Sequence, residues 1–425
     1  MASSYLIDNQ TFTISDHGAQ ALLAKAYAAK KRPACPCTRP PIPMYIAKIE
    51  GHFYVKRMPN TGAKHAPVCD SYEPPAALSG LGEVSGAAIQ EDTESGITSI
   101  KLDFALTKTG ARPAPAATGA ESASVRTDGK KLTIRGLLHY LWDQAQFNRW
   151  SPNMDGRRNW GTIHKYLTVA ASNKSAKGES LAESLFVPEP YSPDRRAEID
   201  GRRRKLLAPL VPSGKSRRLM LVVGEVKEIG AARYGGKITI KHLPGMALLI
   251  NEDLHKRLDK RFASELALWD TLAESGVRLM LIGTMGQNDG GTYSLHEIAL
   301  MLVTAQWLPF QTKDEYDLID AMVRGNRRFT VGLRYNLPSD RPLATAVLSD
   351  TTPAAVAMYA LPIQAGSAYF EQLAELVDEA QMPAWFWRQG EAMPALPSPE
   401  NYVSMPVPTE DEVATEHADA DDYAS

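Results

Sequence analysis

All three cysteines of this 425-residue chain lie in one short stretch near its amino terminus. Cys35 and Cys37 stand two positions apart, and Cys69 follows His65 by four positions. Three thiolates and one imidazole form a Cys₃His set, which holds zinc tetrahedrally in structural sites. The sequence therefore predicts one structural Zn²⁺ bound by Cys35, Cys37, His65 and Cys69.

The residues between the two pairs explain how the four ligands can meet. Residues 44–50 and 53–58 have the composition of short strands, and Gly51-His52 stands between them. Glycine in the first central position suits a type II′ turn, so an antiparallel hairpin would return the chain to its starting point. His52 is a rival fourth ligand, but the turn places it at the far end of the hairpin. We therefore expect a zinc-stapled hairpin with a binding role.

Two other interpretations of the cysteines stay open. Free cysteine often behaves as a small buried hydrophobe, and reactive thiols serve redox chemistry. A disulfide between Cys35 and Cys37 would close a strained ring and leave Cys69 over. The low cysteine content, with no secretory signal, leads us to expect a reducing cytoplasm.

Charge is distributed unevenly along the chain. The net charge is −2, yet residues 400–425 contain several acids and no Lys or Arg, so the rest of the chain is basic. Residues 201–218 hold the densest positive charge, with no acid among them. Side chains of this kind give salt-sensitive contacts to nucleic-acid phosphates. The predicted nucleic-acid-binding residues are Arg202, Arg203, Arg204, Lys205, Lys215, Arg217 and Arg218.

Two further cations, Lys56 and Arg57, lie on the predicted hairpin beside aromatic residues. Basic side chains interleaved with aromatics suit phosphates and stacked bases, so we add these two to the predicted nucleic-acid-binding set. A solvated surface without a ligand is the alternative for both basic groups.

Glu225 and Lys227 lie on an apolar strand and form half of a metal-dependent nuclease motif. In such sites the carboxylate holds Mg²⁺ and the lysine assists the attacking water. The second half would be an acid on the preceding strand, but the nearest upstream acids lie in a segment without a strand pattern. Nuclease activity is therefore an alternative rather than the main hypothesis.

Residues 329–335, 342–350 and 357–361 resemble the strand order of restriction-endonuclease-like domains. In those enzymes an Asp follows the proline and a Glu-x-Lys lies on the next strand. Here Ala344 stands near the Asp position, and Met358 or Tyr359 stands near the Glu position. The resemblance implies a degenerate core without metal ligands.

A wider resemblance rests on several motifs together. They are Cys-Pro-Cys at 35–37, the run at 56–62, His-x₃-Cys-Asp-Ser-Tyr-Glu-Pro at 65–74, and the segments at 137–142 and 147–150. In combination they resemble the uncharacterised bacterial domain-of-unknown-function family 1173, over residues from about 4 to about 395. Members of that family are carried on plasmids and integrative conjugative elements. The resemblance implies a mobile-element context and no particular activity.

These patterns predict an α+β multidomain protein, since the chain is too long for one ordinary core. It would have an N-terminal zinc-stapled β-hairpin module, a helical middle and an α/β C-terminal part. The expected units are 1–75, the zinc-binding module; 76–130, a β segment and Pro/Ala/Gly-rich linker; 131–212, a helical basic module; 213–310, an α/β domain; 311–395, the degenerate restriction-endonuclease-like core; and 396–425, a disordered acidic tail.

The function that these expectations favour is that of a non-enzymatic, zinc-containing nucleic-acid-binding protein of a mobile genetic element. DNA is the expected nucleic acid, proteins of the same element are further expected partners, and no membrane is expected because apolar runs are only strand-sized. Two alternatives stay open: a nuclease using Glu225 and Lys227, and a protein–protein adaptor in a conjugation or defence complex.

Overall fold

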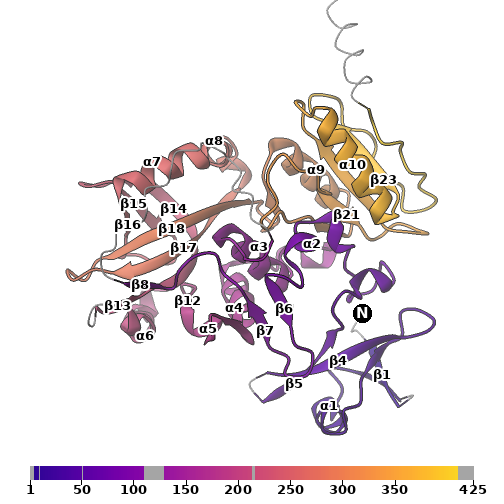
Figure 1. The fold of residues 1–425 in the computed structure, drawn as a ribbon, viewed down its shortest axis with the longest axis horizontal. Helices are drawn as coiled ribbons and strands as arrows, with labels where there is room; N and C mark the ends of the chain where they lie inside the picture. Colours follow the sequence, from indigo (N-terminus) through magenta and orange to yellow (C-terminus); the bar gives the residue numbers. More distant parts are fainter. Residues whose placement is uncertain (1–3, 9, 50, 110–128, 213–215, 410–425) are drawn as a thin grey trace, which may run out of the picture.

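The computed structural model describes residues 4–8, 10–49, 51–109, 129–212 and 216–409. Over these residues the protein is a mixed α+β structure with several sheets. Figure 1 shows the N-terminal sheet at the lower right, a large sheet at the left, and a third sheet with two helices at the upper right. Most of the predicted linker, Lys215 and the acidic end of the chain lie outside the described residues.

The N-terminal sheet has the strand order β2-β1-β3-β4-β5 and contains the predicted hairpin. Strands β4 and β5 pair antiparallel, with Met44 opposite Arg57 and Lys48 opposite Phe53. Met44 and Ile46 alternate along β4 and are buried with residues of helix α1. The elements are β1 (Ser4–Ile7), β2 (Gln10–Thr13), α1 (Ala19–Ala28), β3 (Ala34–Cys35), β4 (Ile42–Ile49) and β5 (His52–Arg57).

The middle of the chain forms a four-stranded sheet and several helices. Helix α3 is a core helix, because it is apolar on most sides and its Trp142 indole donates to the Trp307 carbonyl at 3.2 Å. Thr133 caps it by accepting the Gly136 N–H at 3.0 Å. The elements are α2 (Leu81–Val84), β6 (Ile89–Glu91), β7 (Thr98–Ile100), β8 (Thr107–Thr109), α3 (Ile134–Gln144), α4 (Trp160–Ala171), β10 (Lys174–Ala176), β11 (Glu179–Ser180), α5 (Leu181–Ser184) and α6 (Arg196–Leu207).

The large sheet is seven-stranded, and five of its strands close a ring. The ring closes because β14 pairs with β17 through its first half and with β15 through its second half. A β-bulge between Val226 and Glu228 marks the change of partner. The elements are β12 (Leu185–Phe186), β14 (Met220–Ala231), β15 (Gly236–Ile240), β16 (Leu248–Ile250), α7 (Glu252–Arg261), α8 (Ala263–Thr271), β17 (Arg278–Gln287), β18 (Tyr293–Val303) and β19 (Pro309–Phe310); β13 (Ser216–Arg218) pairs separately with β8.

The C-terminal sheet has the order β23-β22-β21-β20-β9. Strands β20, β21 and β22 form an antiparallel meander, and β23 joins β22 in parallel after helix α10. Strand β9 comes from the predicted helical module and pairs with β20. The elements are β9 (Arg149–Trp150), α9 (Lys313–Arg324), β20 (Phe329–Val331), β21 (Ala346–Leu348), β22 (Val356–Leu361), α10 (Ser367–Ala380) and β23 (Ala384–Arg388).

Part of the segment predicted as a disordered tail packs on this sheet. The Tyr402 hydroxyl donates to the Ala384 carbonyl at 3.0 Å, and the Ala384 N–H donates to the Ser404 hydroxyl at 2.9 Å. The first residues after 396 are therefore ordered, because β23 offers them unpaired main-chain groups at its edge. Among the described residues, no helix is both long enough and apolar enough to cross a bilayer.

Candidate metal centre and basic residues

The four predicted zinc ligands come from two segments that the hairpin brings together. Cys35 ends strand β3, and Cys37 follows it in the turn before β4. His65 follows a short 3₁₀ turn at Gly62–Lys64, and Cys69 lies in the next turn, where its N–H donates to the Ala66 carbonyl at 2.8 Å. The pairing of β4 with β5 returns the chain to the first pair, as the sequence indicates.

The ligand atoms of Cys35, Cys37, His65 and Cys69 all lie within 4.8 Å of one another. The Cys35 and Cys69 sulfurs are 3.7 Å apart, and His65 Nδ1 lies 3.3 Å from the Cys37 sulfur and 3.8 Å from the Cys69 sulfur. Two thiolates on one tetrahedral zinc are about 3.8 Å apart when each Zn–S bond is about 2.3 Å. The separations are therefore compatible with one shared metal ion.

The protonation states of the candidate ligands also matter, because a metal ion binds the neutral imidazole and the thiolate. Burial, and after it the charge of Arg57, lowers the pKa of His65, which keeps its imidazole neutral and able to coordinate. Burial raises the pKa of the Cys35 thiol to about 12 and also raises the pKa of Cys69. A cation among these sulfurs would oppose that effect, because a bound metal favours the thiolate form. All three cysteines are free of disulfides.

A second set of contacts attaches this cluster to the C-terminal sheet. The Ser71 N–H points to the Cys69 sulfur at 3.4 Å. The Glu73 carboxylate forms ion pairs with Arg57 and with Arg149, and the separation from Arg149 is 2.6 Å. Glu73 therefore connects the segment after Cys69 to β5 and β9, a role that sequence reasoning did not give it.

Arg328 makes a parallel connection from the start of the C-terminal sheet. It donates to the Val68 carbonyl and to the Asp70 carboxylate, both at 3.0 Å. Arg149 adds a contact to the Asp70 carbonyl at 3.1 Å. The loop that holds the last cysteine is thus held by arginines that lie far from it in sequence.

The predicted nucleic-acid-binding residues fall into two separate groups. Lys56 and Arg57 lie on β5, while the longer run lies on α6 and β13, in another part of the molecule (Figure 1). Lys56 is half-buried, and burial lowers its pKa. Arg57 forms an ion pair with Glu73. The structure does not bring the two groups into one surface.

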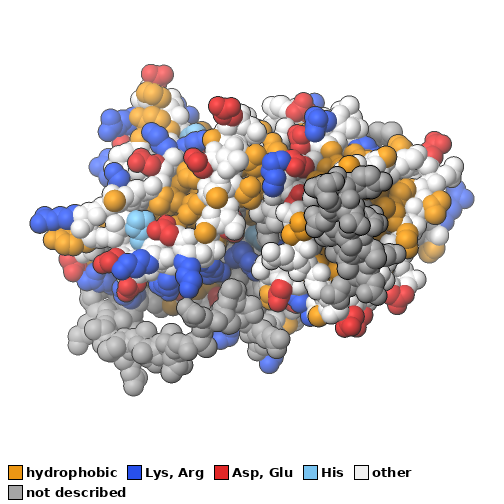
Figure 2. Space-filling model, turned by 90° about the horizontal axis from the view of Figure 1, so that it is seen from above, with side chains coloured by type: hydrophobic (Ala, Val, Ile, Leu, Met, Phe, Trp, Pro, Cys, Tyr) orange, Lys and Arg blue, Asp and Glu red, His pale blue; other side chains and the backbone are white. Residues whose placement is uncertain are grey.

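Most arginines of the longer run carry a carboxylate partner from elsewhere in the chain. Arg202 forms two hydrogen bonds with Glu189, at 2.8 and 2.6 Å. The pairs Arg203–Asp200, Arg217–Asp289 and Arg218–Glu179 have separations of 2.8, 2.8 and 3.0 Å. Charge density in the sequence therefore overstates the free charge of this run. Figure 2 shows a different face, seen from above on the side of α7 and α10, where acidic and basic side chains are interspersed with hydrophobic ones.

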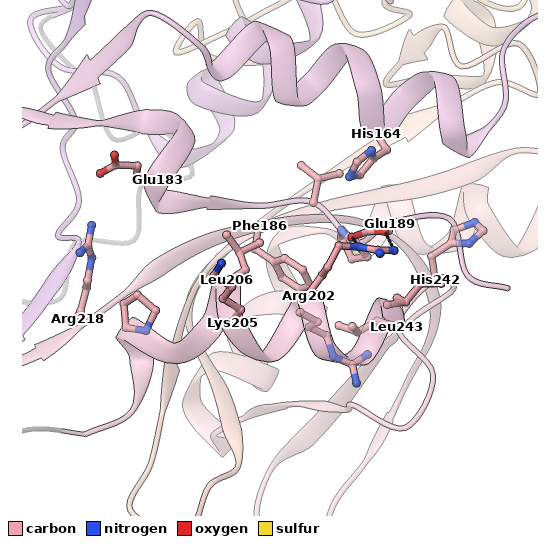
Figure 3. A pocket seen from close by; sticks show the side chains of 15 residues that line it. His164, Glu183, Phe186, Glu189, Arg202, Lys205, Leu206, Arg218, His242 and Leu243 are labelled. Carbon is pink, nitrogen blue, oxygen red and sulfur yellow. Dashed lines mark hydrogen bonds and ion pairs between the residues drawn. The ribbon is translucent and has the colours of Figure 1, made fainter. Parts of the chain in front are cut away.

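Four residues of this run nevertheless line one pocket of about 550 Å³: Arg202, Arg203, Lys205 and Arg218. Figure 3 shows His164 entering it from α4, with Lys205 and Leu206 on α6 and the Arg202–Glu189 pair between them. Its remaining wall is largely apolar and is formed by Phe186, Val187, Pro188, Ile199, Leu206, Pro209 and Leu243. The imidazole of His242, also in the lining, stacks on Trp160 with ring centroids 5.2 Å apart.

The alternative nuclease pair has a different environment. Glu225 is buried and lies 2.5 Å from Lys241 and 3.5 Å from Arg278, whereas Lys227 is exposed. Among the described residues, the one group of three or more His, Cys, Asp or Glu residues suited to a metal is the Cys₃His cluster. Glu225 therefore pairs with two cations at the ring of strands. Within the described residues it does not belong to a group of side chains that could hold a metal ion.

Comparison with known proteins gives one match. The family model described as "Protein of unknown function (DUF1173)" matches residues 5–390. No curated protein and no solved structure matches the chain.

Proposed function

This chain belongs to the DUF1173 family of proteins of unknown function, and from that premise we propose that it is a non-enzymatic nucleic-acid-binding protein with a structural zinc ion. The observation that carries the proposal is the convergence of four sulfur and nitrogen atoms within 4.8 Å. A closed set of four protein ligands leaves no position for substrate, which suits a structural ion. Zinc would be held by Cys35, Cys37, His65 and Cys69.

The pocket at the basic run supports the nucleic-acid part of the proposal. Its rim carries Arg202, Arg203, Lys205 and Arg218, and its wall is apolar, so a phosphate and a base would each find suitable groups. Two ion pairs at this rim, Arg202–Glu189 and Arg218–Glu179, are about one-third to just over one-half exposed, and such pairs contribute little to stability. An arginine can therefore exchange its carboxylate partner for a phosphate with only a small loss of free energy.

The order of elements in the C-terminal part supports a degenerate restriction-endonuclease-like core. Helix α9, the meander β20-β21-β22, helix α10 and the parallel strand β23 follow one another in the order expected for such domains. Ala344, Met358 and Tyr359, at the positions of the missing metal ligands, are buried apolar or aromatic side chains. We propose that this part serves as a scaffold.

The resemblance to proteins of plasmids and conjugative elements makes DNA the proposed nucleic acid. Other proteins of the same element are the proposed partners, and the cytoplasm is the proposed location. The first two proposals rest on the sequence motifs and the third rests on the low cysteine content, and the zinc and pocket proposals do not depend on them.

The test is direct binding of the full-length protein to labelled single- and double-stranded DNA and RNA. Fluorescence anisotropy at two salt concentrations should show binding that weakens steeply with salt, because phosphate contacts release counterions. Zinc measured by elemental analysis on the same preparation reports the metal independently. Absence of binding to all four probes at low salt would contradict the nucleic-acid proposal and leave the zinc proposal standing.

A further inference from the structure

A second, larger cavity of about 880 Å³ lies apart from the metal cluster and from the pocket in Figure 3. Its walls come from the start of α3, from α7, from β18 and β19, and from the segment after β20. We call it the α3–α7 cleft. Five cationic side chains line it, and sequence reasoning assigned none of them: Arg135, Arg257, Lys260, Arg261 and Arg334.

Three of these cations share one face of α7. Arg257, Lys260 and Arg261 are spaced three and four residues apart, which places them on the same side of a helix. Two acids of α7 lie at other positions, where Glu252 pairs with Lys256 and Asp259 lies 3.7 Å from His255. The cleft therefore receives the positive face of this helix.

Arg135 is fixed in the cleft by main-chain groups. Its Nε donates to the Tyr335 carbonyl at 3.0 Å, and its Nη2 donates to the Leu337 carbonyl at 2.8 Å. Carbonyl partners orient a guanidinium without neutralising it. The side chain is half-buried, so its charge is both positioned and poorly solvated.

Arg334 is held in the same way from the opposite wall. Its Nε donates to Gln311 Oε1 at 2.7 Å, and its Nη1 donates to the carbonyls of Pro338 and Arg341 at 3.0 and 2.8 Å. None of these three acceptors carries a charge. Two arginines from different elements are thus oriented by neutral acceptors around one cavity.

The cleft holds more basic than acidic side chains, with five cations against two carboxyl groups, Glu265 and Glu315. Within the part of the chain that the structure describes, no carboxylate oxygen forms an ion pair within 4.0 Å of Arg135, Arg257, Arg261 or Arg334. Burial raises the pKa of both acids, and the nearby charges, Arg135 and Arg261 at Glu265 and Arg334 at Glu315, lower it in part. The positive charge of the cleft is therefore only partly balanced.

Mutual repulsion among the arginines also favours an anion in the cleft. Burial, followed by the charges of Arg334 and Arg261, lowers the pKa of Arg135 to about 10, and the charge of Glu265 opposes this shift only in part. An anion placed between these side chains would relieve that repulsion. The arginines at the pocket in Figure 3 differ, because Arg202, Arg203 and Arg218 already have carboxylate partners.

The remaining wall is apolar, with Phe262, Phe310, Met301 and Leu343 among its residues. Ligand pockets in proteins have volumes of about 300–1,000 Å³ and combine apolar walls with a few oriented polar groups. A cationic side and an apolar side within one cavity suit a ligand with an anionic end and a flat apolar end. A nucleotide has both.

We propose that the α3–α7 cleft binds a nucleotide, with its phosphates on Arg135 and Arg334 and its base toward Phe262 and Phe310. Arg257 and Arg261 act at the mouth of the cleft, where they attract and hold the outer phosphate. Among the described residues, Arg135 Nη1 and Arg334 Nη2 are the guanidinium nitrogens not engaged by protein acceptors, so they are the donors left for a charge-assisted hydrogen bond to phosphate. The proposal is independent of nucleic-acid binding at α6.

The test uses the full-length protein and calorimetric titration with ATP, GTP, inorganic tripolyphosphate and adenosine. We expect ATP or GTP to bind, tripolyphosphate to compete, and Arg257→Ala with Arg261→Ala to weaken nucleotide binding about tenfold or more, since two charge-assisted contacts are lost. These two side chains are exposed, so the variant should fold. Arg135→Lys keeps the charge and removes the fork, and should also weaken binding. Arg324→Ala, an exposed arginine on α9, is the matched control.

Three results would overturn the proposal. The first is no binding of either nucleotide at millimolar concentration. The second is binding that the cleft variants leave unchanged. The third is a short oligonucleotide that displaces ATP and binds more tightly, which would make the cleft part of a nucleic-acid surface. Replacing Arg202, Arg203 and Arg204 by Ala should weaken nucleic-acid binding and leave the effect of the cleft variants on ATP binding in place, so failure of one proposal is distinguishable from failure of the other.

Discussion

The Arg149 guanidinium lies 2.6 Å from a Glu73 carboxylate oxygen, and this contact joins strand β9 to the loop that holds Cys69. The other Glu73 oxygen receives Arg57 from β5. One carboxylate therefore connects the N-terminal hairpin, the cysteine loop and the C-terminal sheet. Both arginines and the carboxylate are less than one-quarter exposed, so water only partly screens the contacts.

Replacing Glu73 by Gln should destabilise the protein markedly. The variant keeps the shape of the side chain but leaves Arg57 and Arg149 without their shared counter-charge, and losing one partner of a half-buried ion pair costs about 1–3 kcal/mol of unfolding free energy. Urea unfolding followed by circular dichroism measures the change. Glu252→Gln removes an exposed ion pair with Lys256 and should change little. Equal unfolding midpoints for the two variants would contradict this role of Glu73.

Purified protein prepared without chelator should contain one equivalent of zinc. His65→Ala should lose most of it, because three thiols alone leave the tetrahedral set incomplete. His52→Ala is the matched control and should retain zinc, since His52 begins β5 at the other end of the hairpin. Elemental analysis gives the metal content of each protein. Less than about half an equivalent in the wild type would contradict the zinc proposal, as would equal zinc in both histidine variants.

Chelation of the metal should loosen the connection between the N-terminal and C-terminal sheets. The Cys69 loop carries Val68 and Asp70, which accept hydrogen bonds from Arg328. Hydrogen exchange should therefore increase around residues 65–73 and in β9 after treatment with a strong chelator, while β17 and β18 remain protected. Uniform exchange before and after chelation would show that the cluster has no structural role.

The sequence was informative where the controlling contacts are local. The Cys₃His cluster follows from the spacing of its residues, and β4 pairs with β5 as expected. The expected turn was wrong in its register, because Ile49 pairs with His52, so His52 belongs to β5 and Gly51, with a φ of 86°, is the last residue of the turn and not the first central one. Helix α1 begins only at Ala19, because Gly18 before it adopts a left-handed conformation with a φ of 91°. Local sequence patterns indicate that a helix forms, whereas the neighbouring loops determine the residues at which it begins and ends.

Long-range partners were not predictable from one sequence. Arg217 and Arg218 meet Asp289 and Glu179, residues that tertiary folding alone brings near. The cations of the α3–α7 cleft come from segments with no shared motif, so no local signal marks Arg135 or Arg334. Glu225 is buried and pairs with Lys241 on the neighbouring segment, a contact that the strand pattern around it does not indicate.

His139 should make stability depend on pH in acid. It is buried in α3, its Nδ1 accepts the Tyr335 N–H at 3.0 Å, and burial lowers its pKa to about 3. Between pH 3 and its unfolded pKa of about 6.5 the unfolded chain binds the additional proton, so stability is present above about pH 6.5 and falls as pH decreases through this window, by up to about 1.4 kcal/mol per pH unit.

The measurement is urea unfolding of the wild type and of His139→Gln between pH 4 and pH 8. The variant removes the titrating group, so its unfolding free energy should fall less steeply with decreasing pH than that of the wild type. Carboxylates add a common background, and the difference between the two curves isolates His139. Parallel curves would contradict the assignment, whatever the absolute stability of the variant.

Replacing Arg202, Arg203 and Arg204 by Ala should weaken nucleic-acid binding for all sequences. Each phosphate contact contributes about −0.9 to the log–log salt slope on duplex and about −0.7 on single strands, so the slope should flatten by up to about three units. The loss should fall short of three, because Arg202 and Arg203 must first leave Glu189 and Asp200. Glu189→Gln should therefore act in the opposite direction and strengthen binding at low salt, since it frees Arg202 for phosphate. Anisotropy titrations at several salt concentrations compare the two variants with the wild type. Wild-type affinity and slope in both variants would mean that α6 is a solvated face and that the chain contacts other molecules elsewhere.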